Sequence, residues 1–160
     1  MGQPADGTTP LARQVYWVAL GFAEQYTCVA TGGRMAGCVL LREDDRDLIQ
    51  LVHELLEDQD YTIVDVVSLE DLLVEATRRG PCVALIDGTH PAGFDLWWLG
   101  PVLSKLGVPA IAFTAHASAQ EQFEHDAHGY VGVLTKPFDA GAFIDLVNSI
   151  CWAHEQQVAS

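Results

Sequence analysis

Basic residues are scarce in this chain, which has 8 Lys and Arg against 22 Asp and Glu and a formal net charge of −14. Proteins that bind DNA or RNA need clustered basic side chains to neutralise phosphates. The charge balance therefore argues against direct nucleic-acid binding. An acidic surface favours cations and basic partner surfaces instead.

Closely spaced cysteines and long apolar runs are also lacking. The four cysteines are scattered, without a CxxC pair, and this excludes zinc ribbons and thioredoxin-like motifs; they are Cys28, Cys38, Cys82 and Cys151. We expect Cys38 and Cys82 to be small buried hydrophobes at the starts of strands in a reduced, cytoplasmic protein. No apolar run is long enough for a membrane span.

The length of 160 residues suits one domain with a single core. Residues 1–34 are interpreted as an N-terminal extension, 35–154 as the domain and 155–160 as a short tail. A helix is expected at about 11–30, because its apolar residues recur at helical spacing. This helix could pack on its own domain or form a homodimer or partner contact. A further alternative is that Met35 is the natural start.

From residue 38 onward, short apolar runs alternate with amphipathic segments. Strands are expected at 38–42, 61–67, 82–86, 108–113 and 131–135. Helices are expected at 46–57, 69–79, 95–106, 118–127 and 139–153. This alternation predicts an α/β fold in which a doubly wound sheet of five parallel strands is covered on both faces.

Acidic residues follow two of these strands. Glu43 and Asp44 come after the first strand, and Asp87 comes at the end of the most apolar one. The carboxyl ends of parallel strands meet at one edge of a sheet, and clustered acids repel one another unless a cation is bound. We therefore expect Mg²⁺ to be held by Asp44 and Asp87 directly, by Glu43 through water and by a backbone carbonyl near Thr89.

A hydroxyl and an amine follow two further strands. Thr114 could donate a hydrogen bond to a phosphoryl oxygen on Asp87, and Lys136 could pair with the charge that develops during transfer. A cis bond before Pro137 would hold the lysine inward. These residues predict a phosphoryl-transfer site.

The stretch from Gly37 to Trp152 resembles the receiver domain of two-component response regulators. The matching positions are the acid pair Glu43-Asp44, the phosphoacceptor Asp87, Pro91 four residues later, the hydroxyl of Thr114 and the signature Lys136-Pro137-Phe138. The resemblance implies a flavodoxin-like fold with strand order 2-1-3-4-5. It also implies Mg²⁺-dependent transfer from a histidine kinase or phosphotransfer protein to Asp87, followed by slow self-hydrolysis and not by enzymatic turnover.

We interpret the chain as a stand-alone receiver that signals through contact with a downstream protein target. The register of the acid pair stays open, because sliding by one residue would give Asp44-Asp45. One position departs from the family pattern: Val133 stands where the family usually has an aromatic switch residue. The alternative function is a receiver fold used for phosphorylation-independent dimerisation or as a scaffold. A phosphatase is the third alternative.

Overall fold

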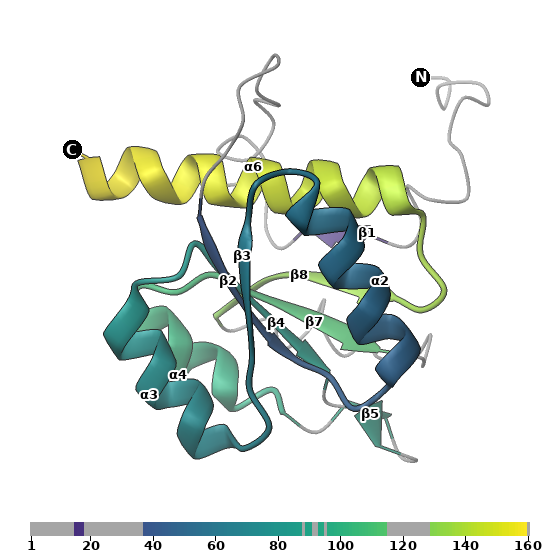
Figure 1. Ribbon diagram of the computed structural model, residues 1–160. Coiled ribbons are helices and arrows are strands. Elements are labelled where there is room, and N and C mark those ends of the chain that lie inside the picture. The colour runs from purple at the N-terminus through teal and green to yellow at the C-terminus, as the bar shows by residue number, and fades with distance from the viewer. Residues whose placement is uncertain are drawn as a thin grey trace, which may run out of the picture.

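The computed structural model describes residues 37–87, 96–114 and 129–159, together with the backbone of the short strands at 15–17, 89–90 and 93–94 (Figure 1). The expected helix at 118–127 lies outside the described residues. In the part of the chain that is described, no helix is long and apolar enough to cross a bilayer.

A six-stranded sheet with the order β1-β8-β7-β4-β2-β3 forms the centre of the molecule. Its five parallel strands are β2 (Cys38–Arg42), β3 (Thr62–Asp65), β4 (Val83–Asp87), β7 (Ala110–Thr114) and β8 (Tyr130–Thr135). Numbered along the chain, these five strands have the order 2-1-3-4-5. The expected flavodoxin-like fold is therefore confirmed. A separate two-stranded sheet pairs β5 (Thr89–His90) with β6 (Gly93–Phe94).

Four described helices cover the two faces of the sheet (Figure 1): α2 (Arg46–Glu57), α3 (Leu69–Arg79), α4 (Leu99–Lys105) and α6 (Ala140–Ala159). Successive strand side chains point to opposite faces, so each strand contributes to two cores. One core joins Leu41 and Leu85 to α2 and α6, and the other joins Leu40 to α3 and α4. Because α6 runs to Ala159, the residues expected as a tail belong to this helix up to that point.

The expected helix at 11–30 is wrong for residues 15–17, because Val15–Trp17 forms strand β1. This strand pairs antiparallel with β8, with Tyr16 opposite Val133. Valine, tyrosine and tryptophan favour strands, and the open edge of β8 offers unpaired backbone groups. Tertiary pairing therefore outweighs the helical spacing here. The remainder of 11–30 lies outside the described residues.

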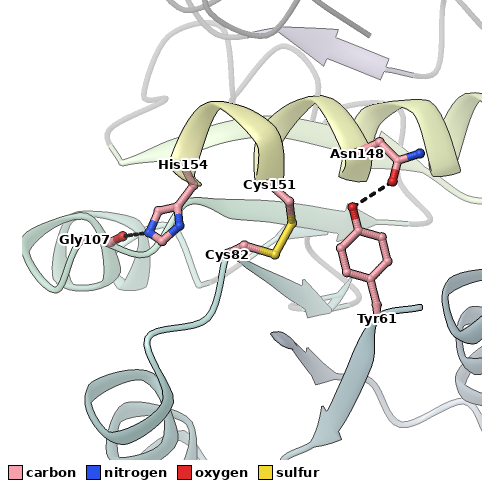
Figure 2. The surroundings of a disulfide bond; sticks show 6 residues. All are labelled: Tyr61, Cys82, Gly107, Asn148, Cys151 and His154. Carbon is pink, nitrogen blue, oxygen red and sulfur yellow. Dashed lines mark hydrogen bonds between the residues drawn. A yellow bond between two sulfur atoms is a disulfide. The ribbon is translucent and has the colours of Figure 1, made fainter. Parts of the chain in front are cut away.

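A disulfide joins Cys82, just before β4, to Cys151 in α6 (Figure 2). This corrects the expectation that the cysteines are unpaired and reduced; Cys38 remains a free, partly buried thiol. Close by, the Tyr61 hydroxyl donates to Asn148 Oδ1 at 2.7 Å, and His154 Nε2 lies 3.0 Å from the carbonyl oxygen of Gly107. Because 69 residues separate the two cysteines, only the fold brings them together.

Candidate functional site

The polar residues that follow the strands meet at the carboxyl edge of the sheet, as expected. Asp87 is the last residue of β4, Thr114 is the last residue of β7, and Glu43 and Lys136 directly follow β2 and β8. The backbone N–H of Lys136 donates to the carbonyl of Thr114 at 2.7 Å, which ties the ends of β7 and β8 together. The Lys136–Pro137 peptide bond is cis, as expected.

Lys136 bridges two carboxylates at this edge. Its Nζ lies 2.9 Å from Glu43 Oε2 and 3.4 Å from Asp87 Oδ2. The side chains are 21% exposed for Lys136, 1% for Glu43 and 12% for Asp87. Screening by water is weak at such burial, so these charge-assisted contacts are stronger than surface ion pairs.

Glu43 is the most buried acid of the site. Burial of its carboxyl group raises the pKa of Glu43, and a hydrogen bond with Asp87 raises it further, while Lys136 and the backbone of Asp45 offset part of the rise. Glu43 Oε1 accepts the backbone N–H groups of Asp44 at 3.1 Å and Asp45 at 3.2 Å. The glutamate is therefore fixed on both oxygens and stands directly beside the phosphoacceptor candidate.

Asp45 has a structural role that separates it from the cluster. Its Oδ1 accepts the backbone N–H groups of Asp47 at 2.9 Å and Leu48 at 3.3 Å, and these bonds cap the N-terminus of α2. Asp44 is exposed next to the site. The cap favours Glu43-Asp44 over Asp44-Asp45 as the functional pair.

The predicted metal ligands are carboxylate and carbonyl oxygens, which are the ligands that Mg²⁺ prefers. Among the described residues, however, no three His, Cys, Asp or Glu side chains are grouped to hold a metal ion. Thr89 begins β5, of which only the backbone is described. The ligand set Glu43, Asp44, Asp87 and Thr89 thus stays a prediction. Thr114 is fully buried at the end of its strand.

Arg42 is a site residue that the sequence reasoning missed. It ends β2, and its Nη1 donates to the main-chain carbonyl oxygen of Asp87 at 2.6 Å. The signal was present, because a basic residue at the end of a buried apolar strand is unusual, and this chain has only 8 Lys and Arg.

Known proteins with similar sequences point to one family. The chain is 31% identical over 114 residues to the response regulator protein FleR of Pseudomonas aeruginosa, an alignment that covers 71% of this chain and 24% of FleR. The chain belongs to the response regulator receiver family. The alignment spans only about a quarter of FleR, so it concerns this domain and not the whole relative. No family model matches the chain.

Two further relatives match over almost their whole length. An uncharacterised 14.6 kDa protein of Leptolyngbya boryana is 30% identical over 118 residues, covering 72% of this chain and 90% of that protein. The structure of a CheY-like receiver domain protein from Methanospirillum hungatei has a TM-score of 0.64 at 18% identity, covering 77% of this chain and 99% of that one. The sequence matches indicate common descent, and the structural match shows the same fold.

Proposed function

We propose that this receiver accepts a phosphoryl group on Asp87. The observation that carries the proposal is Lys136, whose ammonium lies 3.4 Å from Asp87 Oδ2 and 2.9 Å from Glu43 Oε2 at the carboxyl edge of the sheet. An ammonium held there can pair with the negative charge of a phosphoryl group bound to Asp87. The hydroxyl of Thr114 is the proposed donor to a phosphoryl oxygen.

The proposed reaction is a transfer in two steps. An Asp87 carboxylate oxygen attacks the phosphorus of a phosphohistidine on a histidine kinase or phosphotransfer protein, and the P–N bond breaks as the P–O bond forms. Water later attacks the acyl phosphate, which releases inorganic phosphate and restores the carboxylate. This slow loss makes the protein a phosphoacceptor and not a multiple-turnover enzyme.

Magnesium is the proposed cofactor of the transfer. Asp44 and Asp87 would bind Mg²⁺ directly, Glu43 through water, and Thr89 through its backbone carbonyl. The ion supplies positive charge that offsets the clustered carboxylates and the phosphoryl oxygens. The proposed partners are the kinase or phosphotransfer protein and a downstream protein target, in the cytoplasm.

The test is intact-mass analysis after incubation with acetyl phosphate, with and without Mg²⁺. Wild type should gain one phosphoryl group only with Mg²⁺, and Asp87→Asn should gain none. Asp65→Asn is the matched control, since Asp65 also ends a parallel strand of the sheet but lies on the outer strand β3. An unmodified wild type, or an adduct that persists in Asp87→Asn, would overturn the proposal.

One observation favours a second candidate, a scaffold that does not depend on phosphorylation. Val133 stands where the family usually has its aromatic switch residue, and its backbone is paired with β1 through Tyr16. If this pairing stays the same with and without a phosphoryl group on Asp87, phosphorylation would not change the surface at the edge of β8. The scaffold function predicts the same partner binding for wild type and Asp87→Asn, with or without acetyl phosphate.

A further inference from the structure

The side chain of Arg42 continues the contact between β2 and β4 beyond the end of their backbone pairing. The last register pair of the two strands is Arg42 with Ile86. Asp87 comes one residue later, and its carbonyl oxygen accepts a 2.6 Å hydrogen bond from Arg42 Nη1. A guanidinium thus holds the main chain of the phosphoacceptor candidate at the point where β2 turns away.

Arg42 and Lys136 approach the end of β4 from opposite faces of the sheet. Leu40 packs in the core under α3 and α4, and Arg42 follows it by two residues on the same strand. Leu85 packs in the core under α2 and α6, and Asp87 follows it by two residues. Because strand side chains alternate, Asp87 directs its carboxylate to the face opposite Arg42. Two cations therefore flank Asp87, one at its carboxylate and one at its carbonyl.

The partial burial of Arg42 carries a cost. Its Nε is buried, and among the described residues nothing accepts a hydrogen bond from it. Burying part of a guanidinium without a full set of partners costs free energy. An apolar residue would avoid this cost at the end of a buried strand, whereas the arginine adds the hydrogen bond to Asp87.

We propose that Arg42 is a positioning residue for phosphoryl transfer to Asp87, an inference that rests on the proposed function. Its bond fixes the carbonyl of Asp87 and so holds the carboxylate in reach of Lys136. The positive charge of its guanidinium also offsets the neighbouring acids. The reaction needs close alignment, and a misplacement of roughly 1 Å can cost about a hundredfold in rate.

The experiment measures phosphorylation by acetyl phosphate with Mg²⁺ for wild type, Arg42→Met, Arg42→Lys and Arg46→Met. We expect Arg42→Met to lower the rate by about tenfold or more, since alignment is partly lost. Arg42→Lys should restore most of the rate, because one ammonium N–H can replace the Nη1 donor. Arg46→Met removes the same charge from the exposed start of α2 and should leave the rate unchanged.

A second readout tests the position of Asp87 itself. The backbone ¹³C carbonyl chemical shift of Asp87 should change in Arg42→Met and not in Arg46→Met. Leu72→Ala, a change in the core under α3 and α4, controls for lost stability and should retain the rate.

The possible failures are distinguishable. A wild type that gains no phosphoryl group overturns the proposed function together with this inference. A phosphorylated wild type with an equally fast Arg42→Met overturns only the role of Arg42. The same conclusion follows if Arg46→Met or Leu72→Ala loses as much rate as Arg42→Met.

Discussion

The two ends of the central sheet are held together by different interactions. At the carboxyl end, Lys136 joins Glu43 and Asp87 through ion pairs, and Arg42 reaches the carbonyl of Asp87. At the amino end, the Cys82–Cys151 disulfide fixes α6 to the start of β4 (Figure 2). Charged contacts can rearrange when a phosphoryl group or a cation binds, whereas a covalent bond cannot. The candidate phosphorylation site and the disulfide that anchors α6 thus lie at opposite ends of the sheet.

The hydrogen bonds of α6 strengthen this contrast. Asn148 accepts from Tyr61, which precedes β3, and His154 lies against Gly107, which precedes β7. Together with the disulfide, they connect one helix to the amino ends of three strands. We therefore expect changes at the amino end to alter stability and changes at the carboxyl end to alter phosphorylation.

The largest effect is expected for Lys136→Met at the carboxyl end. Loss of the ammonium removes the cation between Glu43 and Asp87, and removal of one group that stabilises transition-state charge typically costs about 10²-fold or more. Mass spectrometry of the acetyl phosphate reaction measures the rate. Lys105→Met, at the exposed end of α4, is the control. Equal rates for wild type and Lys136→Met would refute the assignment of Lys136.

The next effect is expected for Cys82→Ala combined with Cys151→Ala. A disulfide that closes a loop of this length contributes about 4 kcal/mol to stability in the chain-entropy description. Urea unfolding should show a loss of that order, and Cys38→Ala, which removes the free thiol, should show a much smaller one. The phosphorylation rate of the folded double variant should match wild type; a parallel loss of rate would remove the distinction between the two ends.

A smaller effect at the same end is expected for Tyr61→Phe. The change deletes the 2.7 Å hydrogen bond to Asn148 and keeps the ring, so the free energy of unfolding should fall by about 1 kcal/mol. Because burial of the hydroxyl raises the pKa of Tyr61 above its value of 10.0 in the unfolded chain, the stability difference between the two proteins should be full at pH 7 and should shrink as the pH rises through 10. Urea unfolding of wild type and Tyr61→Phe at pH 7 and pH 10 checks both statements. An equal midpoint for the two proteins at pH 7 would contradict the role of this bond.

The smallest effect concerns His53 on α2, with Nδ1 2.9 Å from Glu57 Oε1 and Nε2 2.9 Å from Asp65 Oδ2. Partial burial lowers the pKa of His53, but the hydrogen bonds and charges of Glu57 and Asp65 outweigh it, so the net shift is upward. Protonation therefore stabilises the fold. This contribution is full below about pH 6.5 and is lost as pH rises through the folded-state pKa.

Exposure limits the effect of His53 to under about 1 kcal/mol. Urea midpoints of wild type between pH 5 and pH 8 should decline slightly, relative to those of His53→Gln. Identical pH profiles for the two proteins would show that the ion pairs do not contribute. This measurement adds a partly exposed ion pair between α2 and the end of the outer strand β3, whose effect can be set against that of the buried Lys136 contacts.

Much of the fold was predictable because its signals are local. Apolar runs predicted the five parallel strands to within about two residues, and the helix expected at 69–79 matches the bounds of α3. The residues that end or follow those strands met at one edge because parallel strands all run in the same direction. Asp87, Thr114 and Lys136 could be placed there by this rule alone.

The remaining features depend on contacts between distant segments. Whether Val15–Trp17 forms a helix or a strand was decided by the open edge of β8, which local spacing does not report. The pairing of Cys82 with Cys151 and the reach of Arg42 to the carbonyl of Asp87 required positions in space. Hydrophobic pattern and chain direction are local properties, so they set which strands form and which side chains stand at their ends. Contacts between distant groups depend on how the helices and strands pack, so they follow from the folded arrangement and not from any local pattern.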